Sequence, residues 1–163
     1  MKSPILFLDI DGVLNSDDYV KYHVASDKNL DPDIDPRIAR PLGDVLRKTK
    51  ARIVIISSWR LDRPFEETRK RLANAGLDMP ISFLPGTEGA TDGVHPTRAE
   101  LIRQYLRLHR PSLRPYVIVD DVPMDDKKLL KHQIKTNPAT GLTKEQIRLL
   151  NNKLNSIWNN STK

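Results

Sequence analysis

Two aspartates, Asp9 and Asp11, directly follow the apolar residues 5–8 in the stretch LDIDGVLN. A short, continuous apolar run of this kind is typical of a strand buried on both faces of a parallel sheet. Successive side chains alternate along an extended chain, so we expect the two carboxylates to face the same side, and Gly12 permits a sharp turn after them. Three interpretations of this spacing are open: an acidic turn, a calcium loop and a catalytic pair.

Polar side chains also close two other apolar runs of the sequence. Ser57 and Ser58 follow residues 53–56, and the pair Asp120 and Asp121 follows residues 116–119. Carboxyl ends of parallel strands meet at one edge of a sheet, where ligands bind. Carboxylates gathered there would repel one another unless a cation neutralised them, and Mg²⁺ takes a few carboxylates together with waters and a substrate phosphate. The carboxylates at the ends of the predicted strands therefore predict a Mg²⁺ site.

The calcium interpretation fits this loop poorly. An EF-hand loop follows a helix and carries glycine at its sixth position and glutamate at its twelfth. Here a predicted strand precedes the aspartates, and Gly12 follows the second aspartate at once.

Helical signals separate the predicted strands, which are residues 5–8, 53–56 and 116–119 and a weaker run at 81–84. Asp35 and Pro36 are typical of a helix start, although Pro41 predicts a kink or a late start in the helix over residues 36–50. Gly76 is expected to end a helix over residues 65–75. Capping boxes are predicted from two pairs, Thr97 with Glu100 and Thr143 with Gln146.

Apolar residues then continue each of the last two helices. The face predicted after Thr97 consists of Leu101, Ile102, Tyr105, Leu106 and Leu108, and the closing helix over residues 143–158 carries Ile147, Leu150, Leu154 and Ile157. Strands that alternate with helices predict an α/β fold with a three-layer, doubly wound and mainly parallel sheet.

Composition suits one soluble domain over residues 1–163, with 38% hydrophobic and 29% charged residues. No apolar run approaches the roughly 20 residues that span a bilayer, and the N-terminus lacks the features of a signal peptide. The absence of cysteine excludes disulfides and thiolate metal sites and is compatible with the cytoplasm. The net charge of +6 favours polyanionic partners, although a solvated basic surface explains it equally well.

The ordered set of motifs resembles the haloacid dehalogenase (HAD) superfamily of phosphotransferases. LDIDGVLN matches its first motif, Ser57 in IVIISSWR its second, Arg98 at a helix start its third and VIVDD its fourth. The resemblance implies that Asp9 is the nucleophile that forms an aspartyl-phosphate and that Asp11 is the general acid and base. It also implies that Ser57 and Arg98 bind the phosphoryl group.

The resemblance further implies a Mg²⁺ site made by Asp9, Asp120, Asp121 and the backbone carbonyl of Asp11. Spacing varies in the fourth motif, so Asp125 or Asp126 is an alternative to Asp121. Only about 35 to 40 residues separate successive motifs, which implies a small or missing cap domain. Residues 16–35, with Tyr19, Tyr22 and His23, are then expected to form a flap loop over the site.

IVIISSWR and the later NPATGLT are similar to a capless HAD group, the HAD domains of RNA-repair (Swiss Army Knife) and bacteriophage proteins. Expected substrate-binding residues are Gly12, Asn15, Ser58, Trp59 and Arg60. Trp59 and Arg60 would stack on a base or grip a phosphate, or Trp59 is a packing residue. A basic strip for a nucleic-acid backbone, or a solvated helix face, is formed by Arg103, Arg107, Arg110, Arg114, Lys127, Lys128 and Lys131.

These observations predict a Mg²⁺-dependent phosphomonoester hydrolase that acts on nucleotides or nucleic-acid phosphate ends. The cytoplasm of a bacterial or phage-infected cell is the expected location. A small-metabolite phosphatase is an alternative enzyme, and a HAD-fold module that binds nucleic acid or protein without turnover is an alternative from another class.

Overall fold

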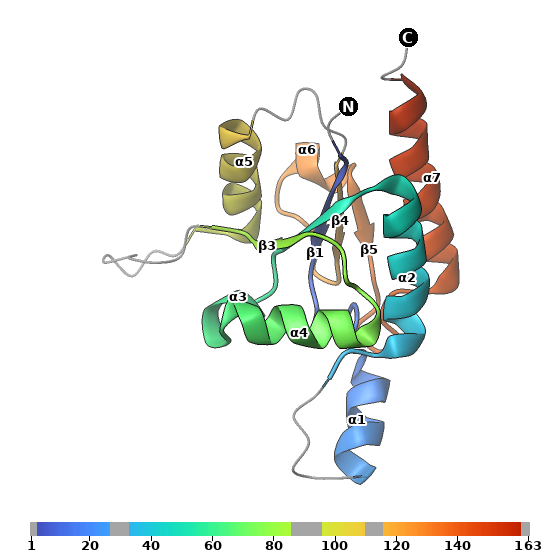
Figure 1. Cartoon of the computed structure of the whole chain (residues 1–163). Helices are drawn as coiled ribbons and strands as arrows, with labels where there is room; N and C mark the ends of the chain where they lie inside the picture. Colours follow the sequence, from blue (N-terminus) through green and yellow to red (C-terminus); the bar gives the residue numbers. More distant parts are fainter. Residues whose placement is uncertain (1–2, 27–32, 86–95, 110–115, 161–163) are drawn as a thin grey trace.

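The computed structural model describes residues 3–26, 33–85, 96–109 and 116–160. Its centre is a sheet of five parallel strands in the order β3-β2-β1-β4-β5 (Figure 1). The strands are β1 (Ile5–Leu8), β2 (Arg52–Ile55), β3 (Ile81–Phe83), β4 (Tyr116–Asp120) and β5 (Gln133–Lys135). The predicted parallel sheet is confirmed, and β5 is a strand that the sequence analysis missed.

Helices cover both faces of this sheet, which confirms the three-layer prediction (Figure 1). One face packs against α2 (Pro36–Thr49), α4 (Phe65–Ala75) and α7 (Lys144–Asn160). The other face packs against α5 (Arg98–Leu108) and the short α6 (Lys127–Leu130). Two further helices, α1 (Asp17–Ser26) and α3 (Trp59–Asp62), follow the carboxyl ends of β1 and β2.

Alternation along β1 divides its side chains between the two cores. Leu6 and Leu8 enter the core shared with α2 and α7, whereas Ile5 and Phe7 enter the core shared with α5. All four are at most 1% exposed, and burying a side chain of this size stabilises the fold by about 1.5 to 3 kcal/mol. The continuous apolar run thus reflects a strand covered on both faces.

The strand order reverses between β1 and β4. From β1 the chain moves outward through α2 to β2 and through α4 to β3, and it then returns through α5 to β4 on the other side of β1. In open α/β sheets, ligands bind at the carboxyl edge where the order reverses in this way. A ligand is therefore expected to bind at the loops after β1 and β4.

Most predicted helix ends are confirmed. The Asp35 side chain accepts a hydrogen bond from the Arg37 amide at the start of α2. Gly76, with a φ of 111°, ends α4. The capping box of Thr97 and Glu100 has both hydrogen bonds, as has that of Thr143 and Gln146.

The predicted late start of α2 at Pro41 is wrong, because α2 is continuous from Pro36 to Thr49. The ring removes one backbone donor near the helix start, while the buried stripe of Ile38, Leu42 and Leu46 holds the helix on the sheet. Leu108, predicted on the buried face of α5, is 68% exposed because the helix ends there. The Ile157 side chain lies outside the described residues.

The predicted flap loop at residues 16–35 holds a helix in its first part. This helix is α1, which is ten residues long and follows the carboxyl end of β1 (Figure 1). The Ser16 hydroxyl accepts a hydrogen bond from the Tyr19 amide at 3.2 Å, and Asp17 and Asp18 lie in the first turn. These are ordinary helix-start signals. Within the described part of the chain, no helix has the length and hydropathy to cross a membrane.

Candidate active site

The register of β1 and β4 brings Asp9 and Asp120 together. Leu8 pairs with Val119, and the Asp9 amide donates to the Val119 carbonyl at 3.0 Å, so the next residues of both strands lie side by side. Both aspartates follow, by two residues, a side chain on the face that α5 covers. Asp9 is 4% and Asp120 0% exposed.

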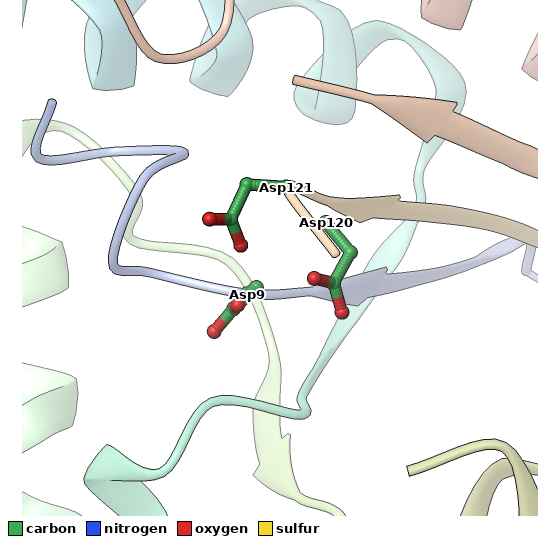
Figure 2. A group of neighbouring side chains, drawn as sticks. All are labelled: Asp9, Asp120 and Asp121. Atoms are coloured by element: carbon green, nitrogen blue, oxygen red, sulfur yellow. The ribbon is translucent and has the colours of Figure 1, made fainter. Parts of the chain in front are cut away.

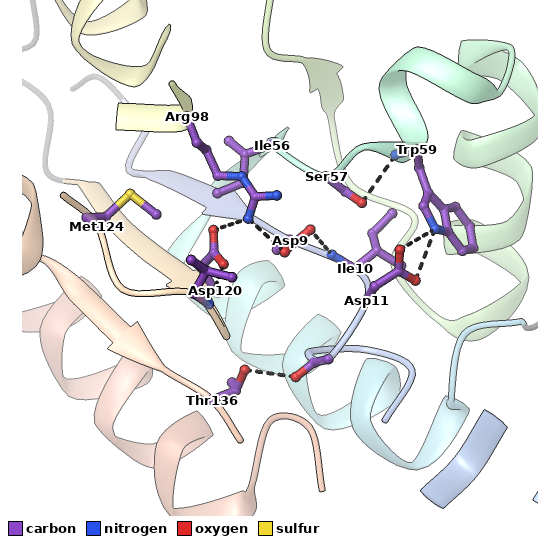
Figure 3. Close-up of polar contacts among 12 residues, drawn as sticks. Asp9, Ile10, Asp11, Ile56, Ser57, Trp59, Arg98, Asp120, Met124 and Thr136 are labelled. Atoms are coloured by element: carbon purple, nitrogen blue, oxygen red, sulfur yellow. Dashed lines mark hydrogen bonds and ion pairs between the residues drawn. The ribbon is translucent and has the colours of Figure 1, made fainter. Parts of the chain in front are cut away.

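Arg98 is the cation that faces these two buried carboxylates. It is the first residue of α5, whose start is held by the Thr97 capping box. Its Nη1 atom donates to Asp9 Oδ2 at 2.9 Å and also to Asp120 Oδ2 (Figure 3). The predicted third-motif residue therefore lies against the predicted nucleophile, although the two are far apart in the sequence.

Asp121 completes a cluster of three carboxylates. One oxygen each of Asp9, Asp120 and Asp121 lie within 4.8 Å of one another (Figure 2). Gly12 makes room for this cluster, because a Cβ atom on Gly12 would lie 2.7 Å from Asp121 Oδ2. Gly12 also has a φ of 70°, which side chains disfavour. The predicted substrate-binding Gly12 is thus buried and serves the geometry of Asp121.

Burial and mutual repulsion shift the acidity of this cluster. Burial, followed by the neighbouring Asp9 carboxylate, raises the pKa of Asp120 to about 6. Burial likewise raises the pKa of Asp9, against the opposing effect of Arg98 and of hydrogen bonds from the Ile10 amide and Ser57. Although burial opposes it, the two carboxylates raise the pKa of Arg98, which stays charged.

The donor set fits a divalent metal ion. Three carboxylates against one contacting guanidinium leave two negative charges, and hard cations such as Mg²⁺ prefer carboxylate oxygens. Arg98 bonds to one oxygen of Asp9 and one of Asp120, and a carboxylate oxygen can accept more than one contact. The cluster could therefore hold a metal ion, with charge balance as the reason.

Asp11 and Asp125 lie outside the carboxylate cluster. Asp11 would then contribute to a metal site through the predicted backbone carbonyl. Asp125 is exposed on the loop after β4, and Asp126 accepts hydrogen bonds from the Lys128 and Leu129 amides at the start of α6. Of the acids considered for the fourth motif, Asp121 is the one that joins Asp120.

The Asp11 carboxylate is exposed and has neutral partners. The Trp59 indole donates to both of its oxygens at 3.1 Å, and the Asn15 amide donates to Oδ1 at 2.8 Å (Figure 3). Asp9 and Asp11 were expected to face the same side, yet they have different partners. The strand ends at Leu8, and a turn closed by the Val13 and Leu14 amides on the Ile10 carbonyl redirects the chain.

Trp59 does not offer a surface for base stacking. Its side chain is 5% exposed, and the Arg63 guanidinium lies 4.3 Å from the centroid of its ring. This burial favours the packing alternative for Trp59, and its contact with a substrate stays a prediction. Asn15, at 3% exposure, is likewise buried and bonded to Asp11, so it does not present its side chain to a substrate.

The residues at the tip of β2 hold different positions. Ser57 is fully buried, and its hydroxyl accepts a hydrogen bond from the Trp59 amide at 3.3 Å. Ser58 is exposed, and Arg60 donates to the backbone carbonyls of Ile56 and Ser57. Burial and the charge of Arg98 lower the pKa of Arg60. Arg60 thus lies within electrostatic reach of the Asp9 cluster, and its contact with a phosphate stays a prediction.

Gln133 is a supporting residue that sequence reasoning missed. From β5 its side chain accepts a hydrogen bond from the Met124 amide at 2.9 Å and donates to the Val122 carbonyl at 2.7 Å and to the Asp120 carbonyl at 3.3 Å. These bonds hold the loop that carries Asp121. A three-residue strand has no readable alternation, so no pattern in the sequence indicates this role.

Two hollows differ in their relation to the site, because the first is lined by Arg98 and the lining of the second includes none of the site residues. One of about 340 Å³ lies between the start of α5, including Arg98, and the loop over Val122 and Met124. A larger groove of about 810 Å³ runs between α1 and the starts of α2 and α7. The predicted basic strip is only partly described: Arg103 pairs with Asp126 at 2.9 Å, and Arg110 and Arg114 lie outside the described residues.

Comparison with known proteins shows the family to which this chain belongs. Residues 5–147 match the family model described as the HAD domain in Swiss Army Knife RNA repair proteins. Comparisons with curated proteins and with solved structures returned no match. The matched residues include both aspartate pairs, Ser57 and Arg98. Because the match extends over most of the sequence, the chain belongs to the family of HAD domains that occur in Swiss Army Knife RNA repair proteins.

Proposed function

We propose that this chain is a Mg²⁺-dependent phosphomonoester hydrolase that works through an aspartyl-phosphate on Asp9. The observation that supports it most is the cluster at the β1 and β4 tips, where Arg98 bridges two buried carboxylates. Maintaining this buried charge set without a function would be costly, since removing a charge from water is unfavourable unless it is paired. Phosphoryl transfer uses such a combination of carboxylates and a cation.

In the first half of the proposed reaction, an Asp9 carboxylate oxygen attacks the phosphorus atom and the bond to the leaving oxygen breaks. The carboxylic acid of Asp11 gives its proton to that oxygen, which departs as an alcohol. Arg98 and the Ser57 hydroxyl stabilise the phosphoryl oxygens as charge develops on them. Asp9, Asp120 and Asp121 would hold Mg²⁺, which when bound offsets negative charge on the phosphoryl group.

In the second half, the Asp11 carboxylate takes a proton from a water molecule whose oxygen attacks the phosphorus atom. The bond between phosphorus and the Asp9 oxygen breaks, which releases inorganic phosphate and restores the Asp9 carboxylate. Asp11 ends protonated, as it began, so the cycle closes. The exposed position of Asp11 supports this role, because a proton shuttle needs contact with both water and the leaving group.

Phosphorylated RNA ends are the substrate class that we favour within this proposal. The family match names RNA repair proteins, and the net charge of +6 raises the local concentration of polyanions. Among the described residues, the ten-residue α1 is the one element between the first loop and α2, so that part of the chain holds no cap domain. A site without such a domain can admit the end of a polymer.

The proposal is tested by release of phosphate from p-nitrophenyl phosphate with and without Mg²⁺. We expect Mg²⁺-dependent turnover that falls by at least about 10³-fold in Asp9→Asn, because the amide cannot form the acyl phosphate. Asp44→Asn, on the exposed side of α2, is the matched control and should retain activity. Equal activity of Asp9→Asn and the wild-type protein would refute the nucleophile assignment.

The substrate class is tested with a panel of 3′-phosphorylated and 5′-phosphorylated oligoribonucleotides, mononucleotides and sugar phosphates. For RNA ends, we expect the apparent KM to rise steeply with salt concentration, since cations are displaced from the polymer when it binds. A KM that does not change with salt, with preference for a sugar phosphate, would identify a small-metabolite phosphatase instead.

A further inference from the structure

The Asp11 carboxylate is held more firmly than its exposed position suggests. It lies in the loop after β1, where an aspartate side chain has several accessible rotamers. The Trp59 indole and the Asn15 amide donate to it from two directions, at 3.1 and 2.8 Å. All these distances are those of ordinary hydrogen bonds. The carboxylate is therefore oriented by its neighbours.

Both donors are themselves fixed. The Trp59 ring is 5% exposed, packs in the core shared with α2 and α7, and has the Arg63 guanidinium 4.3 Å from its centroid. Its backbone amide donates to the Ser57 hydroxyl oxygen. Asn15 is 3% exposed, and its backbone carbonyl accepts a hydrogen bond from the Gly12 amide at 3.1 Å. Neither donor can turn away from Asp11 without disturbing the core or the loop.

Trp59 also links two parts of the site that are distant in the sequence. The residue lies 48 positions after Asp11 and two after Ser57. Its indole contacts the first and its amide contacts the second. Trp59 thus sets the position of the Asp11 carboxylate relative to the tip of β2.

The chemistry of the donors suits a group that must gain and lose a proton. An indole N–H donates only and does not titrate in the physiological range, and an amide N–H behaves likewise. Neither competes for the proton that Asp11 transfers. When Asp11 is protonated, the oxygen without the proton still accepts from the indole. The same orientation therefore serves both halves of the reaction.

We infer that Trp59 and Asn15 are positioning residues that aim Asp11 at the leaving oxygen and at the attacking water. This inference rests on the proposed function, because it assumes that Asp11 transfers protons. In this arrangement neither Trp59 nor Asn15 contacts the phosphoryl group. Losing the indole N–H should then weaken proton transfer and leave phosphate binding unchanged.

The test compares leaving groups in Trp59→Phe, which keeps a ring and removes the N–H. p-Nitrophenolate departs without a proton, whereas an alkoxide needs one. For the alkyl phosphate that the wild-type protein hydrolyses fastest, we expect kcat to fall about 10- to 100-fold with little change in KM. With p-nitrophenyl phosphate, the pre-steady-state burst of p-nitrophenolate should keep its rate, while hydrolysis of the aspartyl-phosphate slows.

Asn15→Ala removes the second donor and should show the same split between substrates to a smaller degree. It also keeps the inference testable if Trp59→Phe loses stability, since Trp59 is part of the core. Asn74→Ala, an exposed asparagine on α4, is the matched control and should behave as the wild-type protein. Thermal unfolding of each variant checks that the fold is intact.

The outcomes separate this inference from the proposed function. An equal loss in the rate of leaving-group release from both substrates, with the p-nitrophenolate burst slowed as much as release of the alcohol, would overturn the positioning role alone. No loss on either substrate in folded variants would do the same. A wild-type protein that hydrolyses none of the phosphate esters would overturn the proposed function and this inference with it.

Discussion

Asp9 and Asp11 lie two residues apart in one loop, yet their surroundings are opposite. Asp9 is buried beside Asp120 and faces the Arg98 guanidinium. Asp11 is exposed and accepts hydrogen bonds from neutral donors. The buried side of the site is governed by charge balance, whereas the exposed side is governed by orientation.

This difference explains how one residue type can serve two roles. A nucleophile benefits from fixed charges that stabilise the phosphoryl group in a water-poor environment, where electrostatic interactions are strong. A proton shuttle benefits from access to water and from a fixed direction. Strand register decides which carboxylate is buried, and the turn after Leu8 decides which is exposed.

The largest effect is expected when one charge is removed from the buried side of the site. We predict that Asp121→Asn raises the Mg²⁺ concentration for half-maximal activity about 10- to 100-fold, because the ligand charge count falls. A Mg²⁺ titration of phosphate release measures this. Asp125→Asn, four residues later and exposed, is the matched control and should keep the wild-type Mg²⁺ requirement. The reverse result would make Asp125 the distal acid.

Removing the Arg98 guanidinium tests the charge balance of the buried side, with the free energy of unfolding as the measured quantity. Arg98→Ala leaves the buried Asp9 and Asp120 carboxylates without their ion pair, which should lower the free energy of unfolding at pH 7.5 without Mg²⁺ by about 3 kcal/mol. Urea unfolding measures this loss. Arg69→Ala removes an arginine from an exposed pair with Glu66 and is the control, for which we expect little change.

The loss of stability in Arg98→Ala should depend on pH in a defined direction. The pKa of Asp120 is raised to about 6 from 3.8, so the folded protein holds this proton more tightly than the unfolded chain does. This stabilisation is present below pH 3.8 and is lost as the pH rises through 6. Arg98 opposes the shift, so Arg98→Ala should be closer to the wild-type stability at pH 5 than at pH 7.5. An equal deficit at both pH values would contradict the charge-balance explanation.

The smallest expected effect concerns the turn that joins the two sides. Gly12→Ala introduces a Cβ atom that would lie 2.7 Å from Asp121 Oδ2, and its φ of 70° costs a side chain about 1 to 2 kcal/mol. We predict a several-fold higher Mg²⁺ requirement, measured by the same titration. Gly76→Ala is the control, because it places a side chain at a φ of 111° beside Arg40 and not beside Asp121. It should lower stability and leave the Mg²⁺ requirement unchanged.

Patterns that depend on neighbouring residues were readable from the sequence. The strands over residues 5–8 and 116–119, the Asp35 cap and the capping box at Thr97 agree with the structure. The helix α1 was missed although Ser16 and the two aspartates after it are start signals, because its residues show little segregation of apolar from polar positions. The three-residue β5 was missed because it is too short for a pattern.

Motif order is enough to indicate which chemistry is available, because it places Asp9, Ser57, Arg98 and Asp120 at strand ends and a helix start. It does not indicate which side chains meet across the fold. The packed structure was needed to find that Trp59 holds Asp11, that Gln133 holds the loop of Asp121, and that Gly12 makes room for that carboxylate. These contacts join residues distant in the sequence, and their geometry depends on how the strands and helices pack.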